Sequence, residues 1–169
     1  MDLVVNTALE RNISPLIVLS GRAPSFHGGG RPFSAEKQEA YIRFAEHVVQ
    51  RYKGSGIHYE IGNEWNIHNG KNLSKKARQA FLLSYVGLLE KLSPRLRAID
   101  NSLKIVGPVM TGYGVDRGEL EFMLSKGLLD YVDIISIHRY PAKGPVTDHR
   151  TSPESLIDWL VKVENTLMQ

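Results

Sequence analysis

Two short stretches of the chain carry the side chains best suited to acid–base chemistry. Residues 58–66 read His-Tyr-Glu-Ile-Gly-Asn-Glu-Trp-Asn, and residues 133–141 read Asp-Ile-Ile-Ser-Ile-His-Arg-Tyr-Pro. Each begins as an apolar or alternating run, which is the pattern of a β-strand, and Glu64 comes at the end of the first. A carboxylic acid at such a position can give up a proton and later take one back, provided that burial or a neighbouring charge keeps it protonated near neutral pH.

The elements that must position these residues alternate along the chain. Apolar runs bounded by glycine or proline predict strands. Apolar residues that recur with a period of about 3.6 residues predict helices. Proline inside a helix removes a hydrogen bond, so Pro94 predicts a break or kink. The predicted strands are 16–20, 57–63, 104–108 and 133–138, and the predicted helices are 3–11, 34–52, 74–99, 119–129 and one that begins after Ser152. This order is typical of a parallel sheet with crossover helices.

The faces of the predicted strands distinguish two architectures. Side chains alternate along a strand, so His58, Glu60 and Glu64 share one face, and Ser136 and His138 share one face of a later strand. An open doubly wound sheet is covered by helices on both faces and favours apolar residues on both. A polar row therefore favours a barrel over the open sheet. A complete (β/α)8 barrel has eight strands and about 250 residues, so four predicted strands indicate an α/β partial barrel.

In these residues the sequence resembles the clan A glycoside hydrolases, retaining enzymes whose fourth barrel strand ends in Asn-Glu, here Asn63-Glu64. The similarity is greatest to families 39 and 5, which include β-xylosidase-like and cellulase-like proteins. The second stretch is similar to the sixth strand of the clan, which ends in His-x-Tyr-Pro, here residues 138–141. The sequence departs from the clan at Trp65 and Arg139, where the clan often has proline.

The resemblance implies that residues 1–169 are one fragment of a catalytic barrel, containing strands three to six and lacking strands one, two, seven and eight. Glu64 would be the acid/base, and the nucleophile glutamate would be lost with strand seven. Asn63 would hydrogen-bond the 2-hydroxyl of the sugar, and Trp65 could stack on a sugar ring. His138 and Tyr140 would line the subsite and orient the carboxylates. The implied partner is a plant-type or bacterial oligosaccharide or polysaccharide, and the chemistry of two carboxylates requires no metal or cofactor.

Structural interpretations stay open for the same residues. Asn63 could cap a turn, His138 and Tyr140 could be satisfied interior groups, and Trp65 could be a buried aromatic under the loop. Four strand residues span roughly 13 Å, so Glu60 lies too far from Glu64 to act on the same bond. Glu60 is instead interpreted as an interior carboxylate paired with a cation, such as an arginine on an absent strand.

Two other functions compete with glycoside hydrolysis. A metal-dependent, sugar-isomerase-like barrel would gather His58, Glu60, Glu64 and His138 around a divalent ion. A non-catalytic, carbohydrate-binding barrel remnant would keep the fold without the reaction. The glycine-rich residues 28–30 before Arg31 lack the Gly-Lys-Ser/Thr ending of a nucleotide loop, which disfavours a phosphate site.

Composition limits the remaining possibilities. The 169 residues are 42% hydrophobic and 23% charged, as in one globular domain or part of one. The chain has no cysteine, which excludes thiol chemistry, and no apolar run near the roughly 20 residues that span a bilayer. The net charge of +3 comes from scattered basic residues, so we expect no nucleic-acid partner. The first residues lack a secretory signal, and the compartment stays open. Unpaired strand edges in a partial barrel predict self-association.

Overall fold

The computed structural model describes residues 1–20, 31–67, 73–140 and 152–168. The helices are α1 (Asp2–Glu10), α3 (Ala35–Arg51), α4 (Lys75–Ile99), α5 (Gly112–Asp116), α6 (Glu119–Leu124) and α7 (Pro153–Leu167), with a 3₁₀ turn η1 (Leu128–Asp130). The strands are β1 (Leu16–Leu19), β2 (His58–Ile61), β3 (Lys104–Val106), β4 (Met110–Thr111) and β5 (Ile137–His138). The glycine-rich residues 28–30 and Pro141 lie outside the described residues.

All strand pairs are parallel, which confirms the predicted α/β class. One sheet has the order β1-β2-β3, and a second sheet pairs β4 with β5. In the first sheet Glu60 lies between Val18 of β1 and Val106 of β3. An isolated bridge from Val106 to Ile134 links the chain before β5 to the first sheet.

The predicted strand 104–108 is shortened at Gly107 and Pro108, and a further strand that was not predicted, β4, follows them. Pro108 has no N–H to donate to a strand ladder, so β3 ends at Val106 and β4 begins at Met110. Backbone pairing continues across the division, because the Gly107 N–H donates to the Ile134 carbonyl at 2.9 Å. The predicted strand 133–138 is likewise shortened to the two residues of β5.

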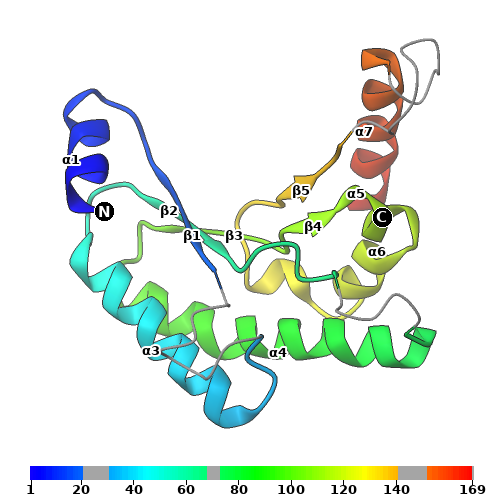
Figure 1. The fold of residues 1–169 in the computed structure, drawn as a ribbon, viewed down its shortest axis with the longest axis horizontal. Helices are drawn as coiled ribbons and strands as arrows, with labels where there is room; N and C mark the ends of the chain where they lie inside the picture. Colours follow the sequence, from blue (N-terminus) through cyan, green and yellow to red (C-terminus); the bar gives the residue numbers. More distant parts are fainter. Residues whose placement is uncertain (21–30, 68–72, 141–151, 169) are drawn as a thin grey trace.

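Helices α3 and α4 cover one face of the first sheet (Figure 1). Tyr59 and Ile61 of β2 are buried on this side together with Leu89 of α4. Tyr41 of α3 donates its hydroxyl to the Leu19 carbonyl at 2.6 Å, and Tyr85 of α4 donates to the Ile61 carbonyl at 2.9 Å. These two hydroxyls attach the helices to the ends of the strands that lead into the loops.

The opposite face of β1 is not covered in the part of the chain that the structure describes. The side chains of Leu16 and Val18 point to this side and are 51% and 45% exposed. A doubly wound sheet would bury both. The uncovered face therefore agrees with the preference for a barrel-type arrangement over an open sheet covered by helices on both sides.

The helix starts agree with the sequence signals, whereas a break at Pro94 is contradicted and the helix predicted for 119–129 is too long. Ser34, Ser74 and Ser152 each accept a hydrogen bond from a first-turn N–H, as N-cap residues do. However, α4 continues through Pro94, because Leu92 and Leu96 are fully buried on either side of it and this packing offsets the lost hydrogen bond. The helix predicted for 119–129 ends at Leu124. Among the described residues, no helix is long and apolar enough to cross a membrane.

Candidate active site

Glu64 lies in the loop that follows β2, in an unusual backbone conformation. The chain turns at Gly62, whose φ is +85°, and Glu64 itself has a φ of +44°. A Cβ added to Gly62 would lie 2.9 Å from Cε3 of Trp65, so this close approach requires glycine. Positive φ is uncommon for glutamate and persists only where the surroundings hold it.

The His138 imidazole is the side-chain partner that the structure gives to the Glu64 carboxylate. The distance from His138 Nδ1 to Glu64 Oε1 is 3.2 Å, and the two side chains are 26% and 20% exposed. The two stretches singled out in the sequence therefore meet, although 74 residues separate these positions. A partly buried carboxyl group beside an imidazole is a suitable arrangement for proton transfer.

Arg31 holds the backbone of the Glu64 loop, a role that sequence reasoning missed. Its Nη2 donates to the Glu64 carbonyl at 2.7 Å, and its Nη1 donates to the Ile67 carbonyl. The guanidinium lies 5.6 Å from the ring centroid of Trp65 and 5.3 Å from that of Phe81. The sequence singles out Arg31 only by its place after the glycine-rich residues 28–30, a pattern that is better known from phosphate-binding loops.

Glu60 is buried and bonded to Ser136, the residue before the strand that carries His138. The Ser136 hydroxyl donates to Glu60 Oε1 at 2.5 Å. The polar faces predicted for the two strands therefore lie toward each other. Within the described residues Glu60 is bonded to this hydroxyl, and the pairing with a cation on an absent strand stays a prediction.

The other three predicted site residues differ in their surroundings. Asn63 is exposed next to Glu64. Tyr140 is also exposed, and its ring lies edge-on to the His138 imidazole, with 6.5 Å between centroids. Of the two alternatives for Trp65, its surroundings fit the buried aromatic under the loop. The residue is 2% exposed, and its ring packs against Tyr85 at 4.7 Å between centroids.

The predicted metal ligands do not assemble into a cluster. His58, Glu60, Glu64 and His138 all belong to the described residues, among which no group of three or more His, Asp or Glu side chains is placed to hold an ion. His58 opens β2, whereas Glu64 follows the end of that strand. The ligand set of the isomerase-like alternative is therefore contradicted by the strand geometry.

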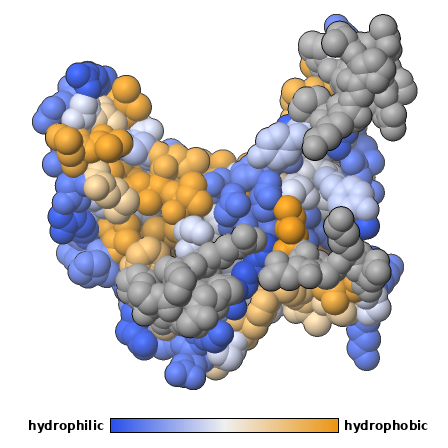
Figure 2. Space-filling model, in the orientation of Figure 1, coloured by the Kyte–Doolittle hydropathy of each residue, from blue (hydrophilic) through white to orange (hydrophobic). Residues whose placement is uncertain are grey.

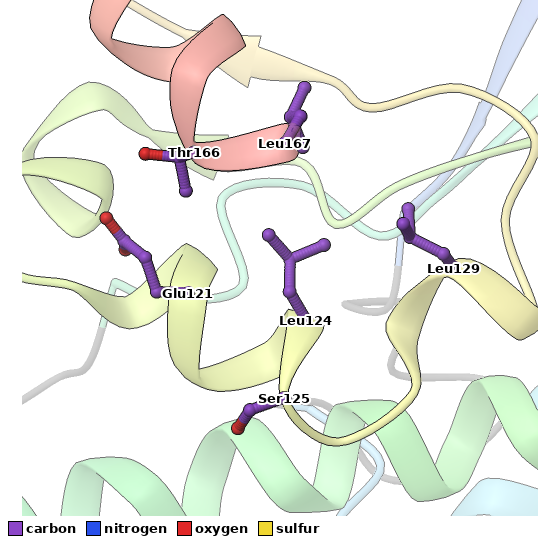
Figure 3. A pocket seen from close by; sticks show the side chains of 6 residues that line it. All are labelled: Glu121, Leu124, Ser125, Leu129, Thr166 and Leu167. Carbon is purple, nitrogen blue, oxygen red and sulfur yellow. The ribbon is translucent and has the colours of Figure 1, made fainter. Parts of the chain in front are cut away.

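A cavity of about 360 Å³ lies away from these residues (Figure 3). It is lined by Glu121, Leu124, Ser125, Leu129, Thr166 and Leu167, which belong to α6, η1, α7 and the chain between them. None of the predicted site residues contributes to it.

Comparisons with known sequences identify no relative. A scan against protein-family models finds no match, and a search of curated proteins finds none either.

Comparisons with solved structures find a shared fold. The chain is similar to a family 39 glycoside hydrolase from the gut symbiont Bacteroides cellulosilyticus WH2, with a TM-score of 0.63 and 21% identity over 83% of this chain and 28% of that one. It is similar to a monomeric β-xylosidase from Caulobacter crescentus CB15, with a TM-score of 0.67 and 17% identity over 98% of this chain and 36% of that one. It is also similar to a family 39 enzyme from Xanthomonas axonopodis pv. citri, with a TM-score of 0.55 and 18% identity over 98% of this chain and 35% of that one. The chain thus spans about a third of the length of these proteins, and it shares the fold of that part of them.

Proposed function

We propose that residues 1–169 form strands three to six of a retaining glycoside hydrolase barrel and that Glu64 is its acid/base. The observation that carries this proposal is the contact between Glu64 and His138, which joins the ends of two parallel strand segments. The carboxyl ends of barrel strands are where active sites form. The folds of a family 39 enzyme and of a β-xylosidase support the barrel part of this proposal.

The proposed reaction uses Glu64 twice. Protonated Glu64 gives its proton to the glycosidic oxygen while a second carboxylate attacks the anomeric carbon, and the bond to the leaving group breaks. The Glu64 carboxylate then takes a proton from water, whose oxygen attacks the same carbon and releases the second carboxylate. His138 holds the Glu64 carboxyl group at Oε1. Asn63 and Tyr140 are exposed beside these groups and are proposed to contact the sugar.

The second carboxylate is proposed to come from a strand outside residues 1–169. Retaining enzymes place it about 5–5.5 Å from the acid/base. The structure gives the Glu64 carboxylate a contact with an imidazole and, within the described residues, no contact with a second carboxylate. We therefore expect the isolated chain not to hydrolyse glycosides. The proposed substrate class is a plant-type or bacterial oligosaccharide or polysaccharide.

The decisive experiment begins with the DNA that follows the codon for Gln169. If the reading frame encodes a further strand ending in glutamate, the longer protein is expressed and tested on a panel of aryl glycosides. Glu64→Gln should lower its turnover by about 100- to 10,000-fold. Azide should partly restore turnover of substrates with good leaving groups, because it replaces the water that Glu64 activates.

Glu90→Gln is the matched control, since Glu90 is an exposed glutamate of α4. It should leave turnover unchanged. Full activity in a folded Glu64→Gln variant would refute the acid/base assignment. A reading frame without the second glutamate would favour the non-catalytic, carbohydrate-binding remnant.

A further inference from the structure

Asn66, two residues after Glu64, joins the loop after β2 to β4. Its carboxamide is buried and makes two hydrogen bonds to one residue. Asn66 Nδ2 donates to Thr111 Oγ1 at 2.9 Å, and the Thr111 N–H donates to Asn66 Oδ1 at 2.9 Å. The Trp65 N–H also donates to the Val109 carbonyl at 3.1 Å. Three hydrogen bonds therefore tie this loop to β4 and to Val109, the residue before it.

Through these bonds Asn66 is connected to Glu64 by a second route, which runs from Thr111 to His138 and from His138 to Glu64. Thr111 is the register partner of His138 in the β4–β5 pair, and His138 contacts Glu64. We propose that Asn66 is a positioning residue, whose carboxamide sets the Glu64 carboxylate against the His138 imidazole. This inference rests on the proposed function only in that Glu64 is taken to be the acid/base. A glutamate held at positive φ needs such external restraint, because its backbone would otherwise relax to a more favourable conformation.

The space around the Asn66 carboxamide is closely filled. A Cβ added to Gly114 of α5 would lie 2.3 Å from Asn66 Nδ2 and 2.9 Å from Glu119 Oε2. Glu119 is buried, and its Oε1 lies 3.6 Å from Arg78 Nε. Burial raises the pKa of Glu119, and the Asn66 amide opposes that increase. The amide is thus enclosed by α5 and α6, as expected for a group that must keep one orientation.

The test measures which imidazole nitrogen of His138 carries the proton. A carboxylate can only accept, so the contact with Glu64 requires a proton on Nδ1 when the imidazole is neutral. The full chain labelled with ¹⁵N-histidine is studied by NMR at alkaline pH, where a free imidazole is neutral. The His138 signal is assigned by its loss in His138→Gln. We expect the Nδ1–H form in the wild type and a several-fold fall in its ratio to the Nε2–H form in Asn66→Ala.

Gly114→Ala and Thr111→Val are further variants that keep the test valid if Asn66→Ala does not fold. The first displaces the carboxamide with a single methyl group, and the second removes the Oγ1 acceptor. Both should lower the Nδ1–H fraction, whereas Thr111→Ser, which keeps the hydroxyl, should not.

Two controls separate positioning from a general loss of packing. Gln38 is a buried amide that joins α3 to Ser84 and Lys91 of α4, so Gln38→Ala removes a comparable group elsewhere. A Cβ added to Gly87 meets nothing within 4 Å, so Gly87→Ala matches Gly114→Ala without the clash. Both controls should keep the Nδ1–H form.

The proposal would be overturned if His138 of the wild type were mainly in the Nε2–H form. It would also be overturned if folded Asn66→Ala or Gly114→Ala kept the wild-type ratio of the Nδ1–H to the Nε2–H form, or if the two controls lost the Nδ1–H form equally. The measurement does not depend on turnover. An inactive longer enzyme would therefore count against the proposed function and leave this inference standing.

Discussion

At the residue scale, the main feature of the molecule is a glutamate held in a strained conformation. Glu64 has a φ of +44°, and its carbonyl is bonded to Arg31 while its carboxylate contacts His138. The left-handed region costs an L-residue about 1–2 kcal/mol. Such cost is common where the chain places a side chain for chemistry.

This strain predicts an unusual order of stability. Asparagine adopts positive φ more readily than alanine, so Glu64→Asn should be more stable than Glu64→Ala by about 0.5–1 kcal/mol. Both variants lose the carboxylate beside His138, so that loss cancels in the comparison. Urea unfolding of the two variants measures the difference. Equal stabilities, or a more stable alanine variant, would show that the backbone at residue 64 is relaxed.

At the scale of the elements, Asp133 connects three parts of the fold. It accepts hydrogen bonds from the Ile105 N–H of β3 and from Nη2 of Arg97 in α4, both at 2.9 Å, just before the chain enters the segment leading to β5. Burial acts to raise the pKa of Asp133, but the bonds from Ile105 and Arg97 outweigh it and hold the pKa below its usual value. The ionised form is therefore favoured in the folded state.

The sign of this shift determines a pH dependence. A carboxyl group whose pKa is lower in the folded state stabilises the protein above its unfolded value of about 3.9, and this stability is lost as the pH falls through the folded pKa. Asp133→Asn should therefore cost about 1 kcal/mol at neutral pH. The cost should shrink below about pH 3.9.

Denaturant unfolding across this pH range measures the effect. Asp130→Asn is the control, because Asp130 is an exposed aspartate of η1, and it should change stability by less than about 0.5 kcal/mol at any pH. A difference between wild type and Asp133→Asn that does not vary with pH would contradict the prediction.

At the scale of the whole molecule, α1 and β1 expose apolar side chains to solvent. Figure 2 shows hydrophobic side chains gathered over α1 and β1. Leu3 and Val4 of α1 and Leu16 and Val18 of β1 are exposed. In the described sheet β1 is an edge strand, with β2 on one side only. An edge strand with exposed apolar residues favours pairing with another chain.

We therefore expect the isolated chain to self-associate. Its mass by light scattering should rise with concentration, and a Leu16→Lys, Val18→Lys double variant should reduce this rise, because lysine on an edge strand opposes pairing. Leu83→Lys is the control, since Leu83 is exposed on α4, away from the sheet edge. A monomer at every concentration would contradict the expectation.

The sequence by itself determined most of the elements and the end of the sheet at which the polar residues gather. The helices predicted to begin at 34, at 74 and after Ser152 begin there, because an N-cap depends on a few consecutive residues. Alternation along residues 58–64 placed Glu60 and Glu64 on one face because strand geometry has a period of two. Both signals are local, so no knowledge of distant parts of the chain was needed.

Only the tertiary structure decided which residues meet. Arg31 on the Glu64 carbonyl, Asn66 on Thr111 and His138 on Glu64 join residues 33 to 74 positions apart. The burial of Trp65 depends on Tyr85, and the continuity of α4 through Pro94 depends on the leucines around it. Packing between distant segments supplies the free energy for these arrangements and overrides local preference. Such packing is not encoded in any short stretch of sequence.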